Sequence, residues 1–107
     1  MLEALRVGYR HIDTAWMYMC EKGVGQGIKE WVGEGDRQDV CVVTKLPHNA
    51  NRAKDVEKLL DKQLANLGLD YVDLYLVHSP IGWKNTGDDL EMSSTDADGF
   101  ANFDYES

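Results

Sequence analysis

The stretch from Gly8 to Tyr18, "GYRHIDTAWMY", begins as a buried strand would and ends in polar side chains. Its first part, Tyr9 to Thr14, is rich in the β-branched and aromatic residues that favour strands. Asp13 and Tyr18 stand where this apolar pattern stops. An acid and a phenol in that position indicate that the strand leads to a functional edge of the fold.

Two later segments have the same strand character. They are Val40 to Lys45, "VCVVTK", and Val72 to His78, "VDLYLVH". Both are nearly continuous apolar runs, which is typical of strands that are covered on both faces in a parallel sheet. The sequence therefore predicts three buried strands.

Helical patterns separate these strands. Apolar residues recur at helical spacing over Glu21 to Val32 and over Arg52 to Leu67, and Leu2 to Val7 has the pattern of the end of a preceding helix. Asn51 is a candidate N-cap and Gly68 a candidate C-terminal stop for the helix between them. Alternating strands and helices predict βαβ units with right-handed crossovers, and hence an α/β fold.

Composition sets the broad class. The chain has 107 residues and 43% apolar content, which suits one globular core. No window has the roughly 18 apolar residues of a membrane span, so we expect a cytoplasmic protein. Cys20 and Cys41 fall in no metal-binding spacing and are expected to be reduced thiols, and no metal is predicted.

Charge divides the chain into two parts. Residues 81–107 hold seven acidic residues and one lysine, a net charge of −6 out of the total of −8. We interpret residues 1–80 as the folded part and residues 81–107 as an acidic loop or tail, either with a short hairpin or disordered. The absence of a basic stripe argues against nucleic-acid binding.

Each predicted strand ends in an ionisable residue. These are Asp13, Lys45 and His78, separated by 32 and 33 residues. In parallel α/β folds the carboxyl ends of the strands meet at one edge, where ligands bind. Alternation along the strands places the three side chains on a common face, and Tyr18, just beyond the first strand, can lean over the same opening.

These segments resemble the aldo-keto reductases. "GYRHIDTAWMY" is similar to the segment of that family that carries an aspartate and a tyrosine, "VVTKLP" to its lysine strand, and "LGLDYVDLYLVHSP" to its histidine strand. The order and spacing of the four polar residues match over about residues 2–80. The resemblance implies a partial (β/α)8 TIM barrel with three parallel strands, two intervening helices and an acidic C-terminal loop.

The resemblance also implies an activity. It implies reduction of small-molecule aldehydes or ketones with hydride from NADPH, most of whose binding site lies outside this chain. Tyr18 would be the proton donor, and Lys45, held by Asp13, would assist the loss of that proton. His78 would orient the substrate carbonyl, and Asp13 would also contact the cofactor.

Other interpretations stay open at this point. Taken singly, Asp13 could be a cap, Tyr18 a packing aromatic, Lys45 a solvated surface residue and His78 a hydrogen-bonded structural residue. A complete barrel needs eight strands, so this chain could instead be an inactive truncated barrel that binds a partner, a gene-model fragment, or a small doubly wound domain of another family. Open sheet edges would favour self-association.

Two further features are not assigned to the site. His11 shares the face of Asp13 but lies one layer deeper, so we expect a satisfied core polar group. The glycines of "GVGQG", Gly23 to Gly27, lack the register of a dinucleotide fingerprint directly after a strand. Close packing of their helix against the sheet is the expected explanation. Asp70 and Asp73 are expected to face solvent.

Overall fold

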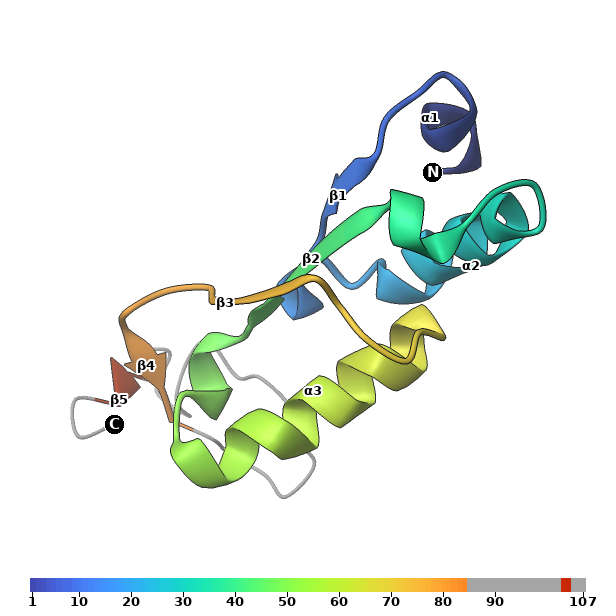
Figure 1. The fold of residues 1–107 in the computed structure, drawn as a ribbon. Helices are drawn as coiled ribbons and strands as arrows, with labels where there is room; N and C mark the ends of the chain where they lie inside the picture. The colour runs from blue at the N-terminus through green and yellow to red at the C-terminus, as the bar shows by residue number, and fades with distance from the viewer. Residues whose placement is uncertain (85–102, 105–107) are drawn as a thin grey trace.

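A computed structural model describes residues 1–84 and 103–104 of the chain (Figure 1). Its centre is a parallel sheet in the order β1-β2-β3. The strands are β1 (His11–Asp13), β2 (Cys41–Leu46) and β3 (Leu74–Val77). The helices are α1 (Leu2–Arg6), α2 (Glu21–Val32) and α3 (Ala53–Leu67), with 3-10 turns η1 (Trp16–Tyr18), η2 (Arg37–Asp39) and η3 (His48–Ala50).

A second, small pairing lies beyond the sheet. β4 (Gly82–Trp83) pairs antiparallel with β5 (Phe103–Asp104), with Gly82 opposite Asp104. Residues 85–102 and 105–107 of the acidic segment predicted for residues 81–107 lie outside the described residues. Among the described residues, no helix has the length and apolar character that crossing a membrane requires.

The core lies between the sheet and the helices. Apolar side chains from every layer meet there, and the largest buried group is Leu5, Ile12, Val24, Ile28, Trp31, Val40, Val42 and Leu67. The periodic apolar positions predicted for α2 supply three of these residues, and the helix has the predicted bounds. Burial of the apolar stripe is therefore what holds α2 on the sheet.

Helix α3 ends as predicted and begins differently. Gly68 has φ 64°, the left-handed conformation that glycine adopts without strain, and it ends the helix. The N-cap, however, is Arg52 and not Asn51, and it makes no side-chain cap hydrogen bond. Asn51 instead follows the 3-10 turn η3 and donates from Nδ2 to the carbonyl of Ser79 at 3.4 Å. This unpredicted turn moves the start of the helix by one residue.

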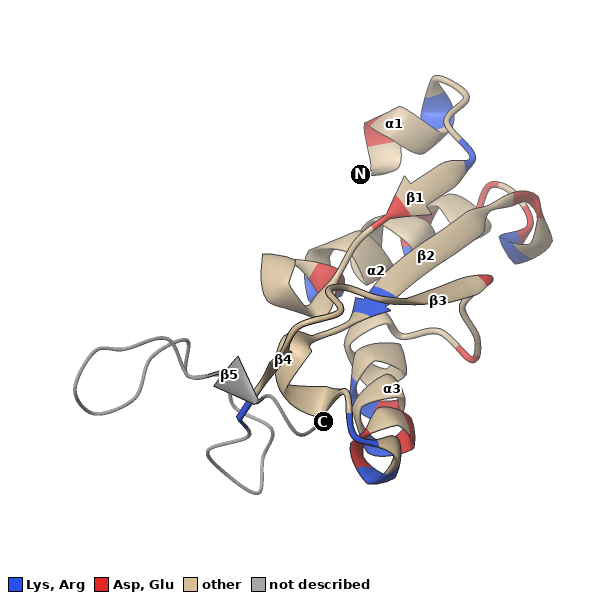
Figure 2. Ribbon diagram, turned by 90° about the vertical axis from the view of Figure 1, so that its left-hand side faces the viewer, with Lys and Arg blue, Asp and Glu red and all other residues tan. Residues whose placement is uncertain are grey.

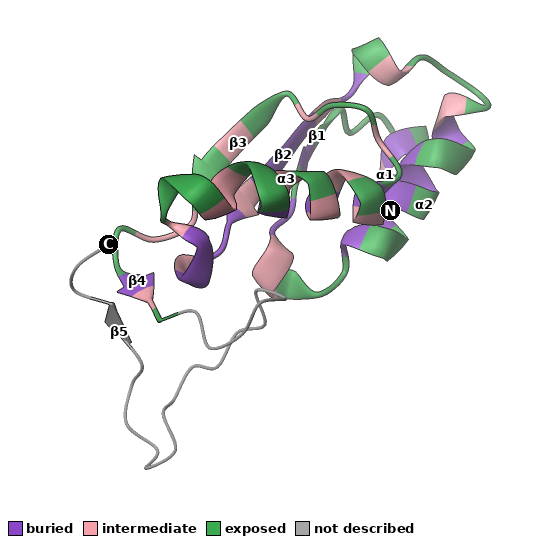
Figure 3. Cartoon of the chain, turned by 90° about the horizontal axis from the view of Figure 1, so that it is seen from below, coloured by how far each residue is buried: buried purple, intermediate pink, exposed green. Residues whose placement is uncertain are grey.

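The two faces of the sheet have different surroundings. Ile12, Val42 and Thr44 lie on the face covered by α2 and α3 and are buried. On the opposite face Leu74 and Leu76 are 48% and 38% exposed, and Figure 3 shows β3 as largely exposed beside the buried β2. His11 also lies on this face and is exposed. The prediction that it is a core group is wrong: Val43, in the middle of the same face, is buried, but the face is exposed at His11 and along β3.

Two glycines of α2 allow close contacts between helices. A Cβ atom at Gly25 would lie 2.0 Å from the carbonyl oxygen of Leu67 at the end of α3, and one at Gly27 would lie 2.6 Å from Cβ of Met1. The sequence predicted close packing here, but against the sheet. The contacts are with α3 and with the start of the chain.

Candidate active site

Lys45 connects the predicted site residues. It lies near the end of β2 with its side chain 14% exposed, and its Nζ donates to Oδ2 of Asp13 at 2.6 Å. The same ammonium donates to the carbonyl of Thr14 at 3.1 Å and reaches Oη of Tyr18 at 3.5 Å. Figure 2 shows the basic position of β2 close to the acidic end of β1. An ion pair and a phenol therefore share one amine.

The register of the sheet arranges the three strand ends in steps. Asp13 pairs with Val43, two residues before Lys45. Lys45 pairs with Leu76, two residues before His78. Residues paired across a parallel ladder share a face, so all three side chains lie on the same face. Each group lies two residues, roughly 6.6 Å, further along the strand direction than the previous one.

A tight turn brings Tyr18 back over the sheet. Tyr18 ends the 3-10 turn η1, where its N–H donates to the carbonyl of Ala15 at 3.1 Å. Met19 follows with φ 51°, a left-handed conformation that reverses the chain before α2. The Tyr18 ring then lies with its centroid 5.1 Å from Nζ of Lys45. The turn thus supplies the fourth group from outside the sheet.

His78 completes the cluster. It follows β3, and its N–H donates to the carbonyl of Leu46 at 3.1 Å, which extends the ladder by one bond. Its ring meets the Tyr18 ring edge to face, with centroids 5.7 Å apart. The structure therefore brings all four predicted residues, Asp13, Tyr18, Lys45 and His78, to the carboxyl end of the sheet.

The ion pair keeps the amine charged. Partial burial lowers the pKa of the Lys45 ammonium, but the hydrogen bonds to Asp13 and Tyr18 outweigh this effect and the pKa lies above its ordinary value. The Asp13 side chain is 51% exposed, so solvent reaches part of its carboxylate. The site presents a fixed positive charge beside a half-exposed phenol.

A buried polar network lies directly behind Lys45 and was not predicted. Oγ1 of Thr44 donates to Oε1 of Glu21 at 2.7 Å, and Nε2 of Gln63 donates to Glu21 and to Thr44 at 2.9 Å each. Gln63 also donates to the carbonyl of Lys45 at 3.2 Å and accepts from Oη of Tyr75 at 2.6 Å. Burial, and then the Glu21 carboxyl, raise the pKa of Tyr75. This network fixes the backbone of β2 where Lys45 leaves it.

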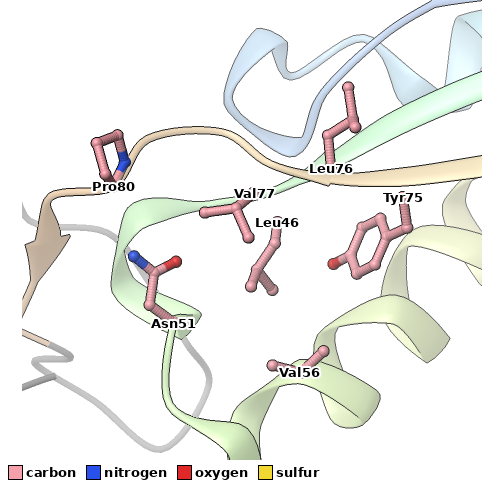
Figure 4. Close-up of a pocket in the computed structure, with 7 residues that line it drawn as sticks. All are labelled: Leu46, Asn51, Val56, Tyr75, Leu76, Val77 and Pro80. Carbon is pink, nitrogen blue, oxygen red and sulfur yellow. The ribbon is translucent and has the colours of Figure 1, made fainter.

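The described part of the chain also has a cavity of about 400 Å³ beside β3 (Figure 4). It is lined by Leu46, Asn51, Val56, Tyr75, Leu76, Val77 and Pro80. None of the four site residues lines it. In residues 1–84 and 103–104, no group of three or more His, Cys, Asp or Glu residues is placed to hold a metal ion.

Comparison with known proteins defines the class. The model of the aldo/keto reductase family matches residues 1–98. The chain belongs to this family of oxidoreductases, and its three parallel strands with their helices are part of a (β/α)8 barrel.

Particular relatives agree with this assignment. The chain is 46% identical over 99 residues to the D/L-glyceraldehyde reductase of Hypocrea jecorina, which is 90% of this chain and 30% of that protein. It matches the structure of an aldose reductase from Schistosoma japonicum with a TM-score of 0.86 and 35% identity, over 96% of this chain and 34% of that one. A Bombyx mori aldo-keto reductase in complex with NADP matches with a TM-score of 0.75 and 46% identity, over 78% of this chain and 28% of that one. The chain thus spans about a third of the length of these relatives.

Proposed function

We propose that this chain carries the catalytic residues of an NADPH-dependent reductase that converts small aldehydes or ketones to alcohols. The observation that supports this most directly is the contact of one ammonium, Lys45 Nζ, with both the Asp13 carboxylate and the Tyr18 hydroxyl. Such an amine is suited to assist a phenol that gives up its proton. The cluster has a hydroxyl donor, a fixed cation and an imidazole at one opening.

Tyr18 acts as the general acid in this proposal. As negative charge develops on the carbonyl oxygen, the Tyr18 hydroxyl donates its proton to that oxygen. The Lys45 ammonium stabilises the phenolate that remains, by about 4 kcal/mol at an effective dielectric constant near 20. Asp13 holds the amine in place, and the raised pKa of Lys45 keeps the amine charged throughout.

His78 orients the substrate. Its ring is next to Tyr18, so a carbonyl oxygen that accepts a hydrogen bond from the imidazole lies within reach of the phenol. Asp13, whose side chain is 51% exposed, would contact the cofactor. NADPH, when bound, supplies the hydride to the carbonyl carbon.

The test uses a complete barrel. Residues 2–84 of this chain replace the matching segment of the Schistosoma japonicum aldose reductase, which gives a barrel chimera. Oxidation of NADPH in the presence of glyceraldehyde is then measured for the chimera and for its Tyr18→Phe variant. We expect a loss of about 10²-fold to 10⁴-fold in kcat for Tyr18→Phe with the fold unchanged.

The control is Tyr71→Phe, which removes an exposed phenol whose ring contacts Arg37. We expect the rate of this variant to equal that of the chimera. A Tyr18→Phe rate close to that of the chimera would show that Tyr18 is not the proton donor. A folded chimera without activity would refute the proposed function itself.

A further inference from the structure

A stack of rings continues from His78 away from Tyr18. His48, in the 3-10 turn η3 that follows β2, lies nearly parallel to His78, with centroids 5.4 Å apart and an interplanar angle of 27°. His48 also stacks on Trp83 of β4, at 4.7 Å and 20°. Tyr18 meets His78 at 87°. The His78 imidazole therefore has rings against it from two different elements.

Hydrogen bonds do not fix these imidazoles in the usual way. Nδ1 of His78 and Nδ1 of His48 are both buried and have no hydrogen-bond partner among the described residues. A functional imidazole is commonly oriented by a hydrogen bond from its second nitrogen to a carboxylate or a carbonyl. The contacts that the structure shows for both imidazole rings are with other rings.

We propose that His48 is a positioning residue for His78. Its ring, supported by Trp83, lies flat on the His78 imidazole and sets the plane in which that imidazole meets Tyr18. The consequence for carbonyl reduction rests on the proposed function, because it assumes that His78 orients the substrate. The geometry of the stack does not depend on that assumption.

The charges around the stack agree with this role. Burial, and then the nearby His78, lower the pKa of His48, so its ring is neutral at pH 7. Among the described residues, Tyr18 of η1 contacts the His78 ring, Lys45 of β2 lies 5.1 Å from the Tyr18 ring, and Lys84 directly follows Trp83 in the chain. A neutral ring supports His78 without adding a positive charge to a site that already holds the Lys45 ammonium.

Two variants of His48 with side chains of similar size test whether a planar ring is needed at this position or whether filling the space is enough. His48→Phe keeps a planar ring, whereas His48→Leu fills the space without one. In the 107-residue chain, we expect nuclear Overhauser contacts between the rings of His78 and Tyr18 in the wild type and in His48→Phe. We expect their loss in His48→Leu. His11→Ala, which changes an exposed histidine of β1, is the matched control and should leave these contacts unchanged.

The same variants in the barrel chimera give the kinetic readout. His48→Leu should lower kcat/KM at least about 10-fold, because small misplacements of orienting groups are costly, and His48→Phe should restore most of the loss. Persistence of the His78–Tyr18 contacts in His48→Leu, or equal kinetics of the Leu and Phe variants, would overturn the proposal. If a variant of the short chain does not fold, the contacts are measured in the chimera. An inactive chimera that keeps the ring contacts would refute the proposed function and leave the positioning role standing.

Discussion

The Asp73 carboxylate shows how a single residue joins two strands at their amino ends. It accepts from the N–H of Val42 at 2.8 Å and from Arg37 at 2.9 Å. Arg37 also donates to the carbonyl of Tyr71 at 3.0 Å, and its guanidinium lies 4.1 Å from the centre of the Tyr71 ring. These contacts tie the start of β2 to the segment that leads into β3.

This carboxylate makes stability depend on pH on the acid side. Burial raises the pKa of Asp73, but the hydrogen bonds from Val42 and Arg37 outweigh this effect and the pKa is lowered. The stabilisation is therefore present above pH about 4 and is lost as the pH falls through the lower pKa of the folded state.

Asp73→Asn should lower the free energy of unfolding by about 1 kcal/mol at pH 7. It should also make the stability less dependent on pH in the acid range. Urea unfolding from neutral pH to pH about 3 measures both effects. The control Asp70→Asn, on an exposed neighbour, should follow the wild type at every pH. Equal acid profiles for Asp73→Asn and the wild type would contradict this account.

At this scale the sequence indicates residue types but not their partners. Strand ends and spacing were enough to select Asp13, Lys45 and His78. Asp73 was expected to face solvent, and its two partners lie 31 and 36 residues away in the sequence. His48 and Glu21 gave no signal, because a ring stack and a buried network have no fixed spacing along the chain.

The contact between α2 and α3 depends on Gly25, which has no side chain. Gly25 lies against the last residue of α3, and a Cβ atom there would overlap the backbone of Leu67. Backbone cannot move aside as the end of a long side chain can. The approach of the two helices, which sets how they cover β2, therefore requires glycine at this position.

Gly25→Ala should destabilise the fold by about 1–3 kcal/mol, because the helices must separate or the sheet must shift. Gly23→Ala is the matched control, since a Cβ atom at Gly23 meets nothing within 4 Å. That variant should stabilise the chain by about 0.5–1 kcal/mol through helix propensity. Urea unfolding of both variants measures whether each one lowers or raises the free energy of unfolding. A Gly25→Ala protein as stable as Gly23→Ala would show that the helices do not approach in this way.

Elements with strong periodicity were predicted best. The bounds of α2 are those predicted from its apolar spacing, and the left-handed Gly68 ends α3 as expected. The turn η3 was missed because three residues are too few to show a period. Each strand begins later than predicted. β1, for example, begins at His11, where pairing with Cys41 starts, and not at Tyr9.

At the scale of the molecule, the sheet that the described strands β1 to β3 form is open. The face that would line the interior of a barrel carries exposed Leu74 and Leu76, and Val77 at the end of the edge strand β3 is 62% exposed. β3 pairs only with β2 among the described strands. An unpaired edge with apolar side chains is a template for pairing with another chain.

We expect the 107-residue chain to self-associate through β3. Sedimentation velocity over a concentration series should show species larger than the monomer, and Leu76→Lys should shift the distribution toward the monomer. Gln38→Lys adds the same charge on an exposed residue of η2, which precedes β2 and is not part of the sheet, and should have little effect. A wild-type chain that stays monomeric at all concentrations would contradict the expectation.

The type of fold could be predicted from the sequence because βαβ order and the spacing of three strand ends both reflect the same parallel sheet. Exposure was predicted correctly for Asp70 and Asp73 but not for His11. His11 was expected in a core, as it would be in a closed interior. The burial of a residue depends on all the strands that surround it, and the three strands of the described sheet do not surround His11.

The stepped register of Asp13, Lys45 and His78 limits which insertions and deletions this chain can accept. One residue added between Val43 and Lys45 would turn the lysine toward the helices and bury its ammonium among apolar groups. Two added residues would return the Lys45 side chain to its original face, but its amine would then lie too far along the strand to reach the Asp13 carboxylate. Insertions and deletions can therefore be accepted around α2 and α3. Within the strands, the number of residues between the first paired residue and Asp13, Lys45 or His78 must stay constant.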